Sequence, residues 1–398
     1  MVTPRDTSAG LVSAAPADLG AAASAFMPSG DVLYLACAAM APRLRAVQAA
    51  GLAALDAGAA PWQAPPEPPE AMLERLRGGI AALLDGDSGA IAAVPSASYG
   101  LATAARNLPL DAGDVVLVLE GQFPSNLLPW QQRCAERGAR LVGVQRGEGG
   151  DWTAAVLAAL ESGPLPRIVA LPQVRWDDGA LLDLDRIAPR VHDIGAALVL
   201  DLSQSLGALP ADLARWRPDF AVSVGYKWLL GPVGLAWLWC APHWRTLGLA
   251  IEQHWSARDA GDGWRFPLDD APLYRAGALR FDAGGLDDPV RLAMAAAGVA
   301  QVAAWGVAAI ADALGERTRA LDAALDAQGL SRWKTPGHAP HITALRPPAD
   351  QLDAVFAAFQ RERIVCTRRY GLLRIAPHLH VEVEDMARVA AVAAAATC

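Results

Sequence analysis

Short apolar runs alternate with stretches of helical periodicity through the middle of the chain. Each run has the length of a fully buried strand and ends at turn residues. The predicted strands are residues 90–94, 114–120, 140–144, 167–171, 197–200, 220–224 and 234–240. Helical spacing lies between several of them, at residues 99–108, 153–161 and 184–195. Strands that alternate with helices predict an α/β fold, with a mostly parallel sheet flanked by helices on both faces.

The two ends of the chain follow a different pattern. The first part predicts a short strand and turn within 30–44, a helix at 42–57, a proline-rich connector at 61–69 and a helix at 70–84. The connector cannot be the interior of a helix, because proline lacks the N–H that a helix needs. An alanine-rich helix is expected at 289–314. The remaining predicted elements are helices at 316–328, 349–362 and from 384, with extended runs at 341–345, 364–367 and 372–376.

The length of 398 residues exceeds what one ordinary hydrophobic core supports and suits one large and one small domain. The change of pattern near residues 60, 288 and 315 suggests where the divisions fall. We therefore expect an N-terminal segment at 1–60, a large domain at 61–288, a linking helix at 289–315 and a small C-terminal α/β domain at 316–398.

Composition narrows the class of protein further. Hydrophobic residues make up 53% and charged residues 19%, which predicts a substantial buried core rather than disorder. The net charge of −8 disfavours a nucleic-acid partner, because phosphate binding needs a basic face. The five cysteines show neither metal-ligand spacing nor a disulfide framework, which favours a reducing cytoplasm. We expect no secretory signal, and no run approaches the ~18 apolar residues of a membrane span.

Three polar residues lie at or near the ends of apolar runs in the central stretch, 197–240. Asp201 lies where one apolar run stops, Gln204 follows three residues later, and Lys227 lies just past the next run. Open α/β sheets bind their ligands at such strand ends. A lysine among apolar neighbours is poorly solvated, which lowers its pKa and makes the amine a nucleophile for carbonyl groups. An Asp alone is often a helix cap, and a Lys alone is usually a surface residue. Their joint occurrence before the turn at 231–234 favours a functional site.

This stretch resembles the lysine region of the class V aminotransferase superfamily of pyridoxal-phosphate enzymes. That superfamily includes kynureninases, cysteine desulfurases and isopenicillin N epimerase-like proteins. The similarity rests on an Asp-x-x-Gln motif, an Asp-Phe pair, Gly225-Tyr226-Lys227 and a Gly-Pro-x-Gly turn. The Gly-Tyr-Lys form looks most like the kynureninase branch. The resemblance implies fold type I, with pyridoxal 5'-phosphate as cofactor and an α-amino acid as substrate.

Roles for the central residues follow from the same resemblance. Lys227 would hold the cofactor as an internal aldimine and then move the proton at the substrate α-carbon. Asp201 would keep the pyridine nitrogen protonated. Gln204 would donate to the phenolic oxygen, and Tyr226 would donate to the phosphate.

The phosphate would lie at the turn between the run at 90–94 and the next helix. Small residues at the opening of a helix expose N–H groups to an anion, and the helix dipole adds to the attraction. The residues at this turn are Ser96, Ala97 and Ser98. In the family an aromatic or His residue stacks on the pyridine ring, and Phe123 matches that position. Gly285 stands where some members have a Thr that reaches the phosphate across the dimer, so only a backbone donor survives.

The resemblance assigns the substrate α-carboxylate to Arg374, whose planar fork suits a carboxylate. Relatives often place Asn near residues 175–178, where this chain has Arg-Trp-Asp-Asp, and Arg175 is a second candidate for a substrate carboxylate. His254 and Trp255 lie in a loop-rich region that reaches the active site and the partner subunit in the family. A homodimer is therefore expected. No metal is expected, since His378 and His380 have no visible third ligand.

The type of reaction stays open at this level. An aminotransferase is placed first, a kynureninase-like or C–S β-lyase second, and an epimerase or a catalytically silent pyridoxal-fold protein third. A cysteine desulfurase that carries a protein persulfide is disfavoured. Its reactive Cys needs a mobile loop, whereas Cys366 stands only eight residues before Arg374 at the end of an apolar run.

Overall fold

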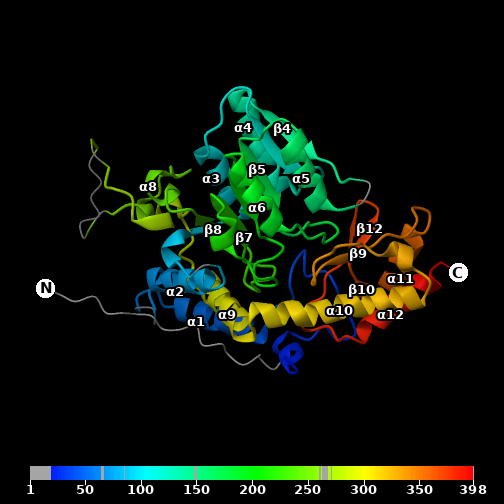
Figure 1. Ribbon diagram of the computed structural model, residues 1–398. Helices are drawn as coiled ribbons and strands as arrows, with labels where there is room; N and C mark the ends of the chain where they lie inside the picture. Colours follow the sequence, from blue (N-terminus) through cyan, green and yellow to red (C-terminus); the bar gives the residue numbers. More distant parts are fainter. Residues whose placement is uncertain are drawn as a thin grey trace.

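The computed structural model describes residues 19–63, 67–84, 86–147, 150–259, 261, 268–269 and 271–397. Residues 1–18, where no secretory signal is expected, lie outside the described residues, as do residues 64–66 of the proline-rich connector and Cys398. Figure 1 shows an upper body built around a sheet, a C-terminal body at its side, and helices running beneath both.

A seven-stranded sheet forms the centre of the upper body. Its strands are β2 (Ile91–Val94), β3 (Val115–Leu119), β4 (Arg140–Val144), β5 (Ile168–Pro172), β6 (Ala197–Asp201), β7 (Phe220–Val224) and β8 (Ala236–Cys240). Their order is β2-β8-β7-β6-β5-β3-β4. β8 is antiparallel to both of its neighbours, and the other pairs are parallel. The α/β class with a mostly parallel sheet is confirmed.

Two hydrophobic cores cover the two faces of this sheet, because successive side chains of a strand point to opposite faces. Leu117, Leu171 and Leu200 face one core, and Val116 and Val199 face the other. The covering helices are α2 (Pro69–Ala82), α5 (Trp152–Ser162), α6 (Leu184–Asp193) and α9 (Pro289–Trp305) on the first face, and α3 (Ala97–Asn107) and α4 (Leu128–Arg137) on the second. Burial on both faces explains why the strands read as uninterrupted apolar runs.

The helix expected over 289–314 is two helices. Gly306, with a φ of 77°, ends α9 and begins α10 (Val307–Ala327), and the two axes differ by 77°. Glycine adopts this positive φ without a steric penalty, so the chain turns here at little cost. Among the described residues no single helix is long and apolar enough to cross a membrane. Within the same residues, the bent α9–α10 pair meets the criteria of length and composition when its two helices are taken together.

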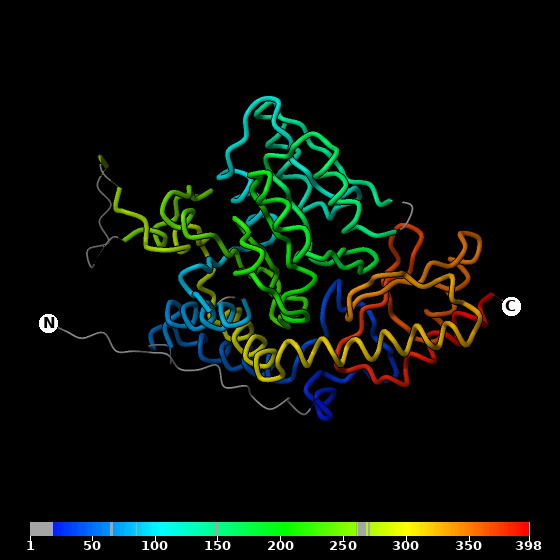
Figure 2. Tube along the Cα trace, viewed as in Figure 1, coloured from blue at the N-terminus to red at the C-terminus, as the bar shows by residue number. Residues whose placement is uncertain are grey.

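The C-terminal body contains two small sheets. One is antiparallel in the order β11 (Thr367–Arg369), β12 (Leu372–Ile375), β9 (Thr343–Leu345), and the other pairs β1 (Leu33–Tyr34) with β10 (Ile364–Val365) in parallel. α11 (Leu352–Arg361), α12 (Asp385–Ala395) and α10 pack on them around a separate core. Figure 2 shows the N-terminal segment, in blue, running beside these C-terminal elements. The N-terminal segment therefore completes a sheet whose other strand comes from near the C-terminus.

The remaining elements are short or lie at the edge of the fold. They are α1 (Arg45–Gly58), α7 (Leu213–Trp216), α8 (Trp244–Leu247) and the 3₁₀ turns Ala22–Ala25, Ser88–Ala90, Pro124–Asn126, Trp255–Ala257, Gly277–Phe281 and Ser331–Trp333.

Candidate active site

A cavity of about 230 Å³ lies at the carboxyl ends of the central strands β5, β6 and β7. Most of the residues expected at a cofactor site line it: Ser96, Ala97, Ser98, Phe123, Asp201, Gln204, Tyr226 and Lys227. They meet there because parallel strands end at one edge of the sheet and each is followed by a loop at that edge. The structure thus brings together residues that are up to 131 positions apart in the sequence.

Lys227 lies in a tightly packed loop just after β7. Leu230, three residues on, adopts a φ of 58°, a conformation that non-glycine residues rarely take. Gly207 lies against the loop: a Cβ at this position would lie 2.5 Å from the carbonyl oxygen of Trp228, so only glycine fits. Strained backbone held by close packing is common at functional sites. The loop leaves Lys227 only 8% exposed, with its side chain on the cavity wall.

Burial lowers the pKa of Lys227 to about 8. The Asp201 carboxylate opposes this change, and the Arg374 guanidinium adds to it. Near neutral pH a part of the amine is therefore unprotonated, although a solvated lysine would be fully charged. An unprotonated amine inside a cavity is the form that attacks an aldehyde.

Asp201 and Gln204 are held in place at the end of β6. Asp201 is buried, and its Oδ1 accepts a hydrogen bond from the Ser203 N–H at 2.9 Å. The Gln204 amide donates to the Ala38 carbonyl at 2.9 Å and accepts from the Trp228 indole at 3.1 Å. The Gln204 carbonyl lies 2.5 Å from Nε2 of His341. Contacts from the N-terminal segment, the lysine loop and the C-terminal body therefore fix the orientation of Gln204.

The opposite end of the cavity is the start of α3. Ser96 caps this helix, since its hydroxyl accepts from the Tyr99 N–H at 3.1 Å. The Ser98 hydroxyl donates to the Ser125 hydroxyl at 2.8 Å. The first N–H groups of an 11-residue helix have no partner within the helix, and its dipole attracts anions. Along the wall, the Phe123 and Tyr226 ring centroids lie 5.7 and 5.9 Å from the Lys227 amine.

Arg374 comes from β12 and is 2% exposed. Its guanidinium donates to the Trp176 carbonyl and, at 3.5 Å, to the Thr367 hydroxyl. Its Nε has no hydrogen-bond partner among the described residues. Burial and, to a smaller extent, the charge of Arg369 lower the pKa of Arg374 to about 10, and Asp177 opposes both effects. A buried cation with a free donor near the amine of Lys227 suits an incoming carboxylate.

Arg175 is engaged within the fold, and its contact with a substrate carboxylate stays a prediction. Its guanidinium makes two hydrogen bonds to Asp177, at 2.6 and 3.0 Å, and donates to the Glu120 carbonyl at 2.9 Å. It also lies 4.3 Å from the ring centroid of Trp152. Arg175 is 4% exposed and, like Arg374, is absent from the cavity lining; the contacts of its guanidinium are with the fold.

Gly285 does not line this cavity in the single chain. It lines a second, smaller one together with His254, Trp255 and the buried pair of Arg77 with Asp282. The expected contact of Gly285 with a phosphate across a dimer stays a prediction, as do the roles of His254 and Trp255.

Sequence reasoning missed several residues of the cavity wall: Gln122, Ser125, Trp176, Ser203 and Val233. The amide nitrogen of Gln122 and the hydroxyl of Ser203 are buried without a hydrogen-bond partner among the described residues. Trp176 lies in the turn after β5, and Asp201 is the last residue of the neighbouring β6. Residues that follow the carboxyl ends of parallel strands commonly face the ligand site, so the position of Trp176 in the sequence was a usable signal.

A family model described as aminotransferase class-V matches residues 68–339 of the chain. The chain belongs to the class-V aminotransferase family. An uncharacterized aminotransferase, YcbU, from Bacillus subtilis is 25% identical over 79% of this chain and 80% of its own length. A probable cysteine desulfurase from Methanothermobacter thermautotrophicus is 30% identical, but the match covers only 42% of this chain and 42% of that relative.

A solved structure with the same fold is that of the cysteine desulfurase CsdA from Escherichia coli. The TM-score is 0.77 at 18% identity, over 96% of this chain and 98% of that one. At 18% identity, this structural similarity establishes the fold of the chain and no more.

Pyridoxal phosphate is the cofactor of this family, and the cavity has a donor set that fits it. The Lys227 amine suits the aldehyde, Asp201 suits the ring nitrogen, and the start of α3 at Ser96 suits the phosphate. The unpaired hydroxyl of Ser203 and amide of Gln122 are further donors in the same wall.

Proposed function

We propose that this class-V family member is a pyridoxal-phosphate-dependent aminotransferase that acts on an α-amino acid. The observation that carries the proposal is the Lys227 amine, whose pKa burial lowers to about 8, in a cavity that also contains Asp201 and lies near Arg374. Each of the three provides one requirement of the chemistry: a nucleophilic amine, a negative charge beside the ring nitrogen, and a cation for the substrate carboxylate.

When bound, pyridoxal phosphate supplies an electron sink for the negative charge that forms at the substrate α-carbon. Lys227 would hold the cofactor through its aldehyde, and the amine, once free of the cofactor, would move the proton at the substrate α-carbon. Asp201, fixed by the Ser203 N–H, holds the proton on the ring nitrogen. The Gln204 side chain is held by Ala38 and Trp228, and its remaining amide hydrogen would be the donor to the phenolic oxygen.

Analysis of the cofactor after a single turnover tests the aminotransferase proposal. The loaded enzyme is mixed with one amino acid and no keto acid, and the cofactor is extracted and separated by chromatography. An aminotransferase converts the cofactor stoichiometrically to its pyridoxamine form and releases one equivalent of keto acid. Repeated release of product without any amino acceptor contradicts this function.

A second candidate is a β-lyase that cleaves the substrate at Cβ. The Gly225-Tyr226-Lys227 sequence favours it, because this form resembles the kynureninase branch of the family, and Tyr226 lines the cavity beside the lysine. In the same experiment a lyase returns the cofactor to its starting form and accumulates a fragment of the substrate over many turnovers.

A persulfide-forming desulfurase has no support in the site. Burial raises the pKa of the Cys366 thiol to about 12, whereas the reactive form of cysteine is the thiolate. Cys366 lies between the short strands β10 and β11 and is absent from the cavity lining. The Cys366→Ala variant should therefore retain full activity with amino acids.

We further propose that the active form is a homodimer in the cytoplasm. Large apolar side chains are exposed in the segment that supplies Trp255 to the second cavity: Leu247, Leu249, Trp255 and Leu273 are 71%, 61%, 42% and 82% exposed. Apolar surface of this kind marks an interaction site. Sedimentation of the loaded enzyme tests the dimer, and a monomer with full cofactor occupancy contradicts it.

A further inference from the structure

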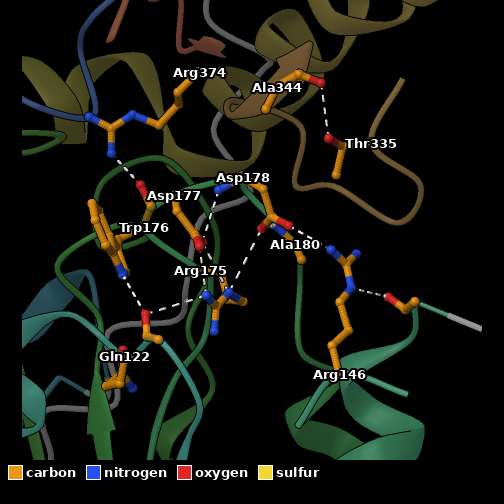
Figure 3. Close-up of polar contacts among 12 residues, drawn as sticks. Gln122, Arg146, Arg175, Trp176, Asp177, Asp178, Ala180, Thr335, Ala344 and Arg374 are labelled. Atoms are coloured by element: carbon orange, nitrogen blue, oxygen red, sulfur yellow. Dashed lines mark hydrogen bonds and ion pairs between the residues drawn. The ribbon is translucent and has the colours of Figure 1, made fainter. Parts of the chain in front are cut away.

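The turn after β5 is a closed unit that is fixed from several sides (Figure 3). Within the turn, the Arg175 N–H donates to the Ala180 carbonyl at 2.9 Å, and the Asp178 carboxylate accepts from the Ala180 N–H at 3.0 Å. Gly179, with a φ of 78°, lies against the C-terminal body: a Cβ there would be 2.1 Å from the Ile342 carbonyl oxygen. The turn therefore cannot shift without disturbing both parts of the molecule.

Ion pairs hold the same turn to its surroundings. The Asp178 carboxylate, 2% exposed, pairs with Arg146 at 2.7 Å and with Arg346 at 2.6 Å. Arg146 follows β4 of the large sheet, and Arg346 follows β9 of the C-terminal body. Figure 3 shows Arg146 reaching toward this carboxylate.

This turn presents a single aromatic side chain to the cavity, that of Trp176. Its indole N–H donates to the Gly121 carbonyl at 3.1 Å, which fixes the ring plane. Phe123 contacts it edge to face with ring centroids 5.3 Å apart, and Tyr370 does so from the other body at 5.7 Å. Three aromatic rings from three separate loops thus pack together; Phe123 and Trp176 line the cavity, and Tyr370 packs on the Trp176 ring.

Tyr370 is held at an energetic cost. It lies at the tip of the β11–β12 hairpin with a φ of 38°, a conformation that favours glycine, and its side chain is 80% exposed. A large exposed aromatic residue in a strained position has no role in a hydrophobic core. Strain of this kind persists where the surroundings enforce it and clusters at ligand sites.

We propose that Trp176 determines substrate specificity and that the substrate is an α-amino acid with a planar aromatic side chain, which packs on Trp176 and Tyr370. This inference rests on the proposed function. Arg374, which donates to the Trp176 carbonyl, places the carboxylate, and the fixed indole then receives the side chain of the same substrate. Aromatic pairs add roughly 0.5–1.5 kcal/mol beyond area burial, so two rings provide discrimination of ~10-fold or more.

Kinetics with phenylalanine, alanine and glutamate test this proposal. The wild-type enzyme should prefer phenylalanine in kcat/KM, and Trp176→Leu, which keeps an apolar side chain, should lose ~10-fold with phenylalanine and little with alanine. Tyr370→Asn should show a smaller loss of the same kind, because Asn tolerates the left-handed conformation. Trp62→Ala is the control, since Trp62 is 81% exposed and does not line the cavity. A preference for alanine or glutamate, or equal losses for all three amino acids, overturns the proposal.

Binding of unreactive acids separates this proposal from the proposed reaction. 3-Phenylpropanoate and propanoate carry the carboxylate without the amine, and calorimetry with the loaded enzyme gives their dissociation constants. The aromatic acid should bind ~10-fold more tightly or better, and Trp176→Leu, which leaves Tyr370 in place, should reduce that difference. Equal affinities overturn the aromatic site even when amino acids react. Failure of every amino acid to react contradicts the proposed function. The affinities of 3-phenylpropanoate and propanoate still show, in that case, whether the site prefers an aromatic side chain.

Discussion

Arg374 donates a hydrogen bond to the main-chain carbonyl of Trp176, although the two residues are 198 positions apart. The contact joins β12 of the C-terminal body to the turn after β5 of the large sheet. A guanidinium that suits a substrate carboxylate is thereby set at a fixed place relative to an aromatic wall. The proposed function and specificity thus assign both ends of the amino-acid substrate to one connected piece of structure.

The first prediction concerns Arg374. Arg374→Ala should raise KM for amino acids by ~100-fold or more, since loss of a partner to a buried charge costs about 3–5 kcal/mol. Arg374→Lys should recover only part of this, because an ammonium lacks the planar fork. The visible spectrum of the bound cofactor should not change. Steady-state kinetics check the result, and an equal loss with amines that lack a carboxylate would show a purely structural role.

Covalent attachment of the cofactor is the second prediction. The chain contains two lysines, Lys227 and Lys334, so each is the natural control for the other. Borohydride reduction of the loaded enzyme should fix the cofactor on Lys227 alone, and peptide mass spectrometry should locate it. Uptake of cofactor by the empty protein should speed up as pH rises through about 8, since the neutral amine is the reacting form. A label on Lys334, or uptake independent of pH, would refute the assignment.

Lys227 should also reduce the stability of the cofactor-free protein. Burial lowers its pKa from 10.5 to about 8, so the unfolded chain binds this proton more tightly than the folded one. The cost is complete below pH 8 and disappears as pH rises to about 10.5. It amounts to roughly 3 kcal/mol at 1.4 kcal/mol per pKa unit.

Urea unfolding at pH 7 measures this cost. Lys227→Met should raise the free energy of unfolding of the cofactor-free protein, whereas Lys334→Met should not, because Lys334 forms an ion pair with Asp326 at 2.7 Å. No gain from Lys227→Met would mean that the amine is solvated.

The fourth prediction concerns acid stability. His341 is fully buried between the lysine loop and the C-terminal body, and burial lowers its pKa to about 4. Between pH 6.5 and 4 the unfolded chain binds a proton that the folded chain does not, so stability should fall as pH decreases through this range. The loss should reach roughly 3 kcal/mol near pH 4. Relative to the wild type, His341→Gln should flatten this dependence.

Chemical unfolding at a series of pH values checks the histidine prediction. His243→Gln is the matched control, since the His243 side chain is 53% exposed. Parallel pH profiles for the wild type and His341→Gln would contradict it.

The sequence by itself determined the sheet and most of the site. Buried strands appear as short apolar runs, and polar residues at their ends lie together because parallel strands finish at one edge. This is why Asp201, Gln204, Lys227 and the turn at Ser96 were predicted and line one cavity. The positions of strands and turns along the chain follow from local sequence patterns, so a single sequence is enough to predict them.

Only the tertiary structure decided which polar and aromatic side chains of the loops face the cavity. Arg175 and Trp176 are adjacent, yet Trp152 and Asp177 hold the first inside the fold, while Gly121, Phe123 and Tyr370 fix the second at the cavity. The outcome depends on partners far away in sequence, which no local pattern specifies. The same reason applies to Gly285, which lines a different cavity in the single chain. Loop side chains are placed by long-range contacts, so their roles emerge only after the chain has folded.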